Sequence, residues 1–207
     1  MDAGRSPPGP GGACALSSAA TPPPPPVHPQ LQTLRDGFLN AHGEARRVAG
    51  GLDEAAFNRP PAPGAWSVGQ CLGHLVTVGA PLADRLEAAL ADARARGLTG
   101  APPYRLGLVG GYFARALAPN RGPMRAPSAY APAEHYDLAA TLGTFEALQE
   151  RLARIVETSE GVALARVRVA SPAAPLLRLN AAAWLTATLA HERRHLAQAA
   201  RARAEVS

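Results

Sequence analysis

Residues 180–203 read NAAAWLTATLAHERRHLAQAARAR. The stretch contains neither Gly nor Pro and is dense in Ala, Leu, Arg and Gln, which are strong helix formers. It therefore predicts a long helix. His191 and His195 lie four residues apart, which on a helix is one turn plus about 40°, so both imidazoles leave the same face.

The face that carries this histidine pair also carries Trp184, Thr188 and Gln198, which indicates that it points into the protein. Two inward imidazoles at this spacing can bind one divalent metal ion. Two core or surface histidines on an amphipathic helix remain the alternative, because a chain with six histidines can contain such a pair by chance. A third ligand elsewhere in the chain must distinguish the two interpretations.

The same residues spell His-Glu-x-x-His, the pattern of zincin metalloproteases, in which Glu192 would be the general base. The neighbouring residues argue against this class. Arg193 and Arg194 would place two cations beside a dication, and residues 197–201 lack the Gly and His of the metzincin continuation.

Composition limits the other classes of function. The chain of 207 residues fits one domain, and its hydrophobic content of 47% suffices for a core. All 21 basic residues are Arg, and they are spread among Asp and Glu along the helices, so we expect no nucleic-acid surface despite the net charge of +5. Cys14 and Cys71 form no disulfide framework, which is consistent with a reducing cytoplasm. No apolar run approaches the roughly 20 residues that span a membrane.

Residues 1–29 hold nine of the 21 prolines. Such a stretch cannot bury enough apolar surface to offset chain entropy, and we interpret it as a disordered tail before a domain over 30–207. In that domain, apolar residues recur every three or four positions, which predicts amphipathic helices and no convincing strand. The predicted long helices are 31–52, 68–96, 133–158 and 180–203, with a short one over 104–117 and loop over most of 53–66.

The helix over 68–96 has the clearest start, because Ser67 and Gln70 form a capping-box pattern. Pro81 lies inside it and predicts a kink or a split. His74 follows the start closely and is the best candidate for a third ligand, although it lies about 100° from the centre of the leucine stripe. The other histidines fit different places: His28 in the tail, His42 at a stripe edge and His135 at a helix start.

Two blocks of the chain resemble DinB-like (DinB/YfiT) proteins. Residues 66–75, Trp-Ser-Val-Gly-Gln-Cys-Leu-Gly-His-Leu, are similar to the family's Trp-Ser-x-x-Glu/Gln-x-x-x-His-Leu block, and residues 191–198 to its C-terminal His-x-x-Arg-His-Leu-x-Gln block. The resemblance covers about 31–203. It implies a four-helix bundle of up-down-down-up topology, a homodimer, and a divalent metal held by His74, His191 and His195.

The resemblance also implies a chemistry, since the family includes thiol-cofactor-dependent enzymes. Three neutral imidazoles leave a position open on Zn, Ni, Fe or Cu, and such an ion activates a thiol or water. The expected function is transfer of a low-molecular-weight thiol to a small electrophilic substrate. A metal-binding bundle without catalysis, serving in stress response, and a metal-dependent hydrolase are the alternatives.

Further polar residues are candidates for support of the site. Gln198 continues the histidine stripe and could hold a ligand by a hydrogen bond. Cys71 lies one turn before His74, and as a fourth ligand it would close the site and favour a structural role. Glu192 lies about 100° around the helix from His191 and could face a neighbouring helix or solvent.

Overall fold

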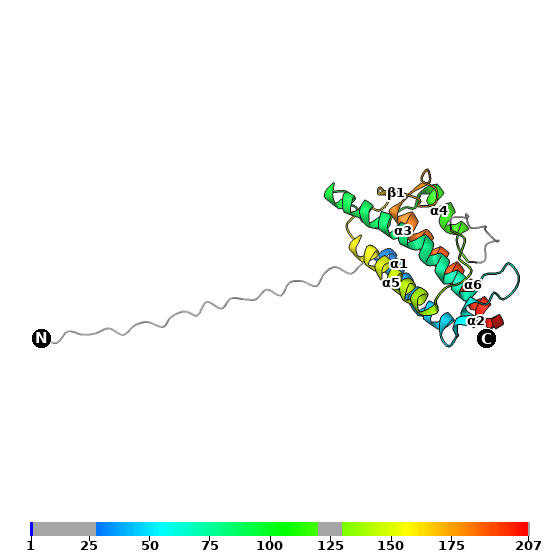
Figure 1. Ribbon diagram of the computed structural model, residues 1–207. Coiled ribbons are helices and arrows are strands. Elements are labelled where there is room, and N and C mark those ends of the chain that lie inside the picture. The colour runs from blue at the N-terminus through cyan, green and yellow to red at the C-terminus, as the bar shows by residue number, and fades with distance from the viewer. Residues whose placement is uncertain (2–27, 120–129, 207) are drawn as a thin grey trace.

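The computed structural model describes residues 1, 28–119 and 130–206, so nearly all of the predicted tail lies outside the described residues. Its elements, shown in Figure 1, are α1 (Pro29–Ala49), α2 (Glu54–Asn58), α3 (Val68–Ala95), α4 (Gly107–Ala116), α5 (Leu138–Thr158), β1 (Arg168–Ala170), β2 (Arg178–Asn180) and α6 (Ala181–Val206).

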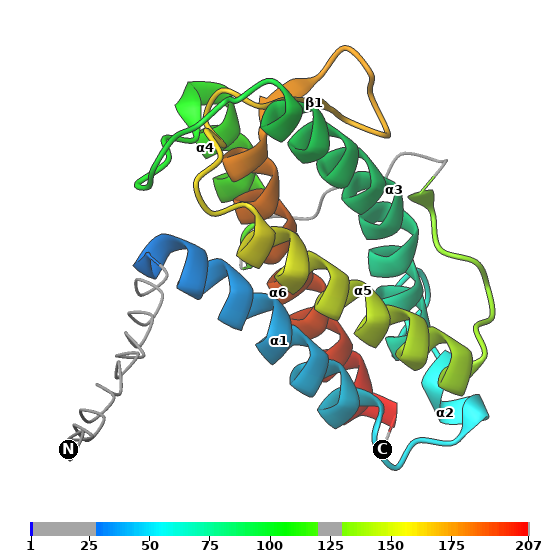
Figure 2. The same cartoon turned by 90° about the vertical axis from the view of Figure 1, so that its left-hand side faces the viewer.

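The four long helices α1, α3, α5 and α6 form the bundle. Helices α1 and α3 each pack against both α5 and α6. In Figure 2, α1 and α6 run toward the end of the bundle that holds the C-terminus, whereas α3 and α5 run away from it. The up-down-down-up topology is therefore confirmed. Among the described residues, no helix has the length and apolarity that crossing a membrane requires.

Local hydrogen bonds determine where the two histidine-bearing helices begin. At α3 the Ser67 hydroxyl accepts from the Gln70 N–H at 3.1 Å, and the Gln70 side-chain oxygen accepts from the Ser67 N–H at 3.0 Å. At α6 the Asn180 side-chain oxygen accepts from the Ala183 N–H at 2.8 Å. The predicted capping box is thus present, and α3 continues through Pro81 as one uninterrupted helix instead of splitting there.

Two predicted helix starts are shifted, and in each case a capping side chain explains the shift. Pro29, assigned to the tail, is the first residue of α1, and His28 caps that helix by accepting from the Gln30 N–H at 3.1 Å. Helix α5 begins at Leu138 instead of residue 133, because the Asp137 carboxylate accepts from the backbone N–H of the third residue after it.

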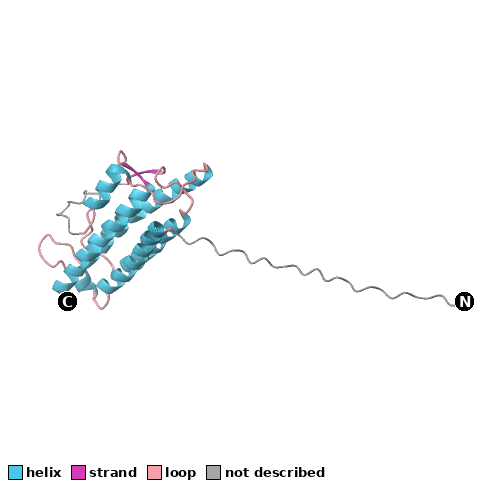
Figure 3. Ribbon diagram, turned by 180° about the vertical axis from the view of Figure 1, so that it is seen from behind, coloured by secondary structure: helices cyan, strands magenta, loops and turns pink. Residues whose placement is uncertain are grey.

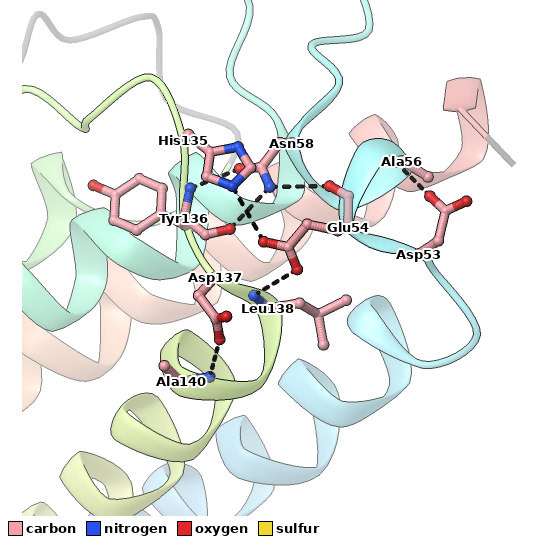
Figure 4. A network of polar contacts seen from close by, with 9 residues as sticks. All are labelled: Asp53, Glu54, Ala56, Asn58, His135, Tyr136, Asp137, Leu138 and Ala140. Carbon is pink, nitrogen blue, oxygen red and sulfur yellow. Dashed lines mark hydrogen bonds and ion pairs between the residues drawn. The ribbon is translucent and has the colours of Figure 1, made fainter.

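The short helix α2 was predicted as loop, and it anchors the segment that precedes α5 (Figure 4). The Asn58 side chain donates to the Tyr136 carbonyl at 2.9 Å and accepts from the Tyr136 N–H at 2.8 Å. Glu54 accepts from the Leu138 N–H at 3.1 Å and pairs with His135 at 3.2 Å. His135 therefore lies just before α5, and this network fixes the position of Tyr136.

The prediction that the chain contains no strand is wrong. Strands β1 and β2 form an antiparallel hairpin in which Val169 faces Leu179. Figure 3 shows the hairpin at the end of the bundle opposite the C-terminus. Each strand has only three residues, which is too short to show the alternation that identifies a strand in sequence. The hairpin is held to the bundle by Trp184, whose indole N–H donates to the Val169 carbonyl at 2.9 Å.

The apolar core consists of two clusters, one toward the hairpin and one toward the C-terminal end. Along α6, Leu189 belongs to the first cluster and Leu196 to the second. His191 and His195 lie between these two residues. The histidine pair therefore falls where one apolar cluster gives way to the other.

Gly73 allows the ring of Tyr136 to lie against α3, because a Cβ built on Gly73 would overlap that ring. We expect Gly73→Ala to lower the free energy of unfolding by about 1–3 kcal/mol, since the rigid ring must move. Gly43→Ala is the matched control: Gly43 lies on α1 with open space around it, and the change should be neutral or stabilising by up to about 1 kcal/mol. Urea denaturation measures both, and equal effects would contradict the proposed role of the close contact.

Candidate metal centre

Three histidines that are far apart in the sequence converge inside the bundle. His74 comes from α3, and His191 and His195 come from successive turns of α6. One ring nitrogen of each lies within 4.8 Å of the others, and the Nε2 atoms of His74 and His191 are 3.4 Å apart. The structure therefore brings together the three histidines that the sequence indicated.

His74 faces inward although it lies off the leucine stripe of its helix. Its side chain is 4% exposed. Helix α3 packs against α5 on one side, where Gly79 meets Leu148, and against α6 on another, where His74 meets His191. A helix that is buried on two sides has a core face wider than one stripe, so the 100° offset does not expose His74.

Hydrogen bonds to the other ring nitrogens orient two of the three imidazoles. His74 Nδ1 lies 2.8 Å from the Tyr130 carbonyl, and His195 Nδ1 lies 3.1 Å from the Gln198 side-chain oxygen. Because these oxygens accept hydrogen bonds, each Nδ1 carries the proton and each Nε2 keeps its lone pair. This is the arrangement that metal-binding histidines require.

Trp66 supports the same rings from one side. Its indole stacks on His195 with ring centroids 5.3 Å apart and an interplanar angle of 17°. It also contacts His74, with centroids 4.9 Å apart. The sequence marked Trp66 as part of a motif but assigned it no place at the site.

Burial keeps the three imidazoles neutral. It lowers the pKa of His195 to about 4, with the neighbouring His74 adding to the effect. The pKa of His191 is lowered well below its usual value by burial and by the other two histidines, and that of His74 is lowered by burial despite its bond to Tyr130. At neutral pH each ring is therefore uncharged and keeps one nitrogen lone pair that a metal ion can bind.

A cavity of about 720 Å³ opens beside the histidines. Volumes of this size are typical of small-molecule sites. Its walls come from α3, α4, α6, the loop between the two strands, and the segments that hold Trp66 and Tyr130. The lining includes Trp66, Leu75, Val78, Leu82, Phe113, Leu177, Trp184, Thr188, Glu192, Arg194 and Gln198. The cavity gives a ligand room to reach the three ring nitrogens.

Glu192 faces both α5 and the cavity, and not solvent. Its side chain is 2% exposed, and its Oε1 accepts from the Gln149 side-chain amide at 3.1 Å. Its Oε2 has no hydrogen-bond partner among the described residues. Burial raises the pKa of Glu192 to about 8, against the opposing effect of Gln149. Gln149 was not singled out from the sequence, although its spacing from Phe145 and Leu152 places it in the core stripe of α5.

Cys71 does not join the histidines. Its side chain is fully buried in the apolar cluster that contains Phe57 and Phe145, outside the cavity lining, and burial raises the pKa of its thiol to about 12. Within the described part of the chain, the close group of metal-ligating side chains consists of the three histidines alone. The position of Cys71 gives no support to a fourth thiolate ligand.

A sequence model of the DinB superfamily matches residues 38–199. The chain belongs to the DinB superfamily. The matched range includes all three histidines together with Trp66 and Gln198. Comparison with curated protein sequences finds no match.

Among solved structures, this DinB-superfamily chain is similar to YfiT from Bacillus subtilis, described as a probable metal-dependent hydrolase with an unusual four-helix bundle topology. The TM-score is 0.56 at 13% sequence identity, and the similarity covers 87% of this chain and 90% of YfiT. At this identity the likeness establishes the four-helix-bundle fold.

Proposed function

We propose that His74, His191 and His195 hold one divalent metal ion. The observation that carries the proposal is the convergence of three neutral imidazoles on a common point. Two nitrogen ligands at about 2.1 Å in a tetrahedral site lie about 3.4 Å apart, and the Nε2 atoms of His74 and His191 are 3.4 Å apart. Without an ion, the 3.4 Å contact is a hydrogen bond in which His191 Nε2–H donates to His74 Nε2, and a bound ion would replace that proton.

The donor set limits the metal and its chemistry. Three imidazole nitrogens suit Zn, Ni, Fe or Cu. With three protein ligands, a bound ion keeps an open position, through which it can lower the pKa of a thiol or water and polarise an electrophile. We propose that the reaction is transfer of a low-molecular-weight thiol to a small electrophilic molecule.

The protein's own residues have defined tasks in this proposal. Tyr130 and Gln198 hold the Nδ1 protons of His74 and His195 and so fix which nitrogen faces the ion. Trp66 limits rotation of the His195 ring by stacking on it. The apolar walls of the cavity lower the local dielectric constant beside a bound molecule, which strengthens electrostatic interactions there.

Hydrolysis is the second candidate reaction. It is favoured by the similarity in fold to YfiT, which is described as a probable metal-dependent hydrolase. The same three histidines would then hold an ion that activates water in place of a thiol. A bundle that binds metal without catalysis would show neither reaction.

The two reactions can be separated by their products. Metal-loaded protein is incubated with a small epoxide and with an activated ester, each with and without a thiol such as cysteine or glutathione, and the products are identified by mass spectrometry. Thiol transfer predicts thioether or thioester products that need both metal and thiol. Metal-dependent products without thiol would show hydrolysis and overturn thiol transfer, and no turnover by protein carrying one ion per chain would favour the non-catalytic bundle.

Gln198 offers a test of the support given to His195. We expect Gln198→Leu to weaken metal binding about 10- to 100-fold, because loss of an outer hydrogen-bond partner typically has an effect of this size. Gln198→Glu keeps an acceptor for His195 Nδ1 and should retain most of the affinity. Competition with a chromogenic chelator measures both variants, and equal loss in the two would contradict this role.

We also propose that the chain acts in the cytoplasm as a homodimer. Leu108, Val109 and Tyr112 on α4 are strongly exposed for apolar or aromatic side chains, and such a patch favours association. Light scattering on the wild type and on Val109→Glu would test the dimer: a monomeric wild type would refute it.

A further inference from the structure

We propose that the substrate is amphipathic, with a polar head at the three histidines and an alkyl or aryl tail that lies in the cavity toward the hairpin. The position of the head rests on the proposed function. The tail site is argued from the cavity lining alone and can be tested without a metal.

Most polar side chains of the cavity gather at one end. His191, Glu192, His195 and Gln198 occupy successive turns of α6, and Glu192 presents a buried oxygen with no partner among the described residues. A ligand's reactive or hydrogen-bonding groups are satisfied at this end. The head of the substrate therefore belongs beside the histidines.

The hairpin end has an apolar wall. Leu82 from α3, Phe113 from α4 and Leu177 from the loop between the strands line it together with Trp184. The Phe113 and Trp184 rings meet edge to face with centroids 5.5 Å apart. The aliphatic and aromatic carbons of these side chains suit a ligand without charge at this end.

The two polar side chains that line the hairpin end, Ser171 and Trp184, already make hydrogen bonds within the protein. The Trp184 indole N–H donates to the Val169 carbonyl at 2.9 Å. The Ser171 hydroxyl accepts from the backbone N–H groups of Ala173 and Ala174, each at 3.2 Å. These groups therefore form the loop and its attachment, and a polar ligand group placed there would lose its water without gaining these partners.

The cavity is also long enough to separate a head from a tail. Trp184 and His195 are eleven residues apart on α6, a rise of about 16 Å. On α3, His74 and Leu82 are eight residues apart, a rise of about 12 Å. A compact molecule bound at the histidines would not reach the apolar wall at the hairpin end, whereas a molecule with an apolar tail would.

The chain contains two tryptophans, and both line this cavity, so intrinsic fluorescence reports its occupation. Metal-free protein, prepared with a chelator, is titrated with butanol, hexanol, octanol and decanol. We expect affinity to rise with chain length, by up to about fourfold for each methylene that is fully buried. If the affinity of the wild type for these alcohols does not depend on their chain length, the proposal is overturned. This test needs no variant of the protein.

Variants then locate the tail. Leu177→Glu introduces a charge on a half-buried loop residue of the cavity wall and should weaken octanol binding at least tenfold. Leu176→Glu is the control, since Leu176 is 99% exposed on the same loop and outside the cavity lining, and it should change affinity less than twofold. Equal effects of the two folded variants, checked by circular dichroism, would also overturn the proposal.

The outcomes separate this inference from the proposed function. The metal content of the wild type, measured by elemental mass spectrometry, is therefore compared with the octanol affinity of the metal-free wild type. Protein that binds long alcohols but no metal retains the tail site and refutes the metal centre. Protein that binds metal but shows no chain-length dependence retains the metal centre and refutes the tail site.

Discussion

His191→Ala is expected to abolish stable metal binding while the bundle stays folded. His191 would supply one of the three ligands. Loss of a hydrogen-bond partner of a ligand typically lowers metal affinity about 10- to 100-fold. Loss of a ligand itself should therefore lower metal affinity by more than about 100-fold. The fold should persist because Ala favours helix and His191 belongs to neither apolar cluster. Elemental mass spectrometry of protein purified without a His tag measures the ion content.

The matched control is His135→Ala. His135 is exposed, lies outside the cavity lining, and pairs with Glu54 at a distance of 3.2 Å. This variant should keep about one ion per chain. At a free metal concentration of 100 times the dissociation constant, the free energy of unfolding of the wild type and of the control should rise by about 2.7 kcal/mol. The free energy of unfolding of His191→Ala should rise by much less. If the wild type carries no ion after reconstitution and His191→Ala unfolds, the histidines are core residues and the metal centre is refuted.

Glu192→Gln is expected to stabilise the metal-free protein at neutral pH. Burial raises the pKa of Glu192 from 4.5 to about 8, so the folded protein holds a proton that the unfolded chain releases. The stabilising effect of that proton is complete below about pH 4.5 and is lost as pH rises toward 8. Gln resembles the protonated acid in shape and does not titrate, so the variant should gain about 3 kcal/mol at pH 7 and almost nothing at pH 4.5.

Chemical denaturation of wild type and variant at several pH values between 4.5 and 8 measures this difference. Glu157→Gln is the control, since it makes the same chemical change on the exposed side of α5, and we expect a difference below about 0.5 kcal/mol. A stability gain that does not grow with pH would show that the Glu192 carboxyl does not hold its proton in the folded state. A confirmed gain would mean that the chain retains a destabilising acid in the wall of its cavity.

Short-range physics determined much of this protein from the sequence alone. The 3.6-residue period places His191 and His195 on one face of a helix, whatever surrounds them. The capping pattern of Ser67 and Gln70 sets the start of α3 and hence the turn on which His74 lies. The apolar stripes of the four long helices predict a bundle, because each stripe must be buried against another. These features depend on residues within a few turns of one another.

The tertiary structure decided which faces meet, because that depends on how the stripes of different helices pack together. It brings His74 to the α6 pair across 117 positions of sequence. It also places the Tyr130 carbonyl on His74 and pairs Gln149 of α5 with Glu192 of α6. The three-residue strands and α2 are too short for local propensity to specify, and they form because the bundle and Tyr136 supply their partners. Periodicity therefore predicted the histidine pair, and packing alone completed the three-histidine cluster and shaped the cavity beside it.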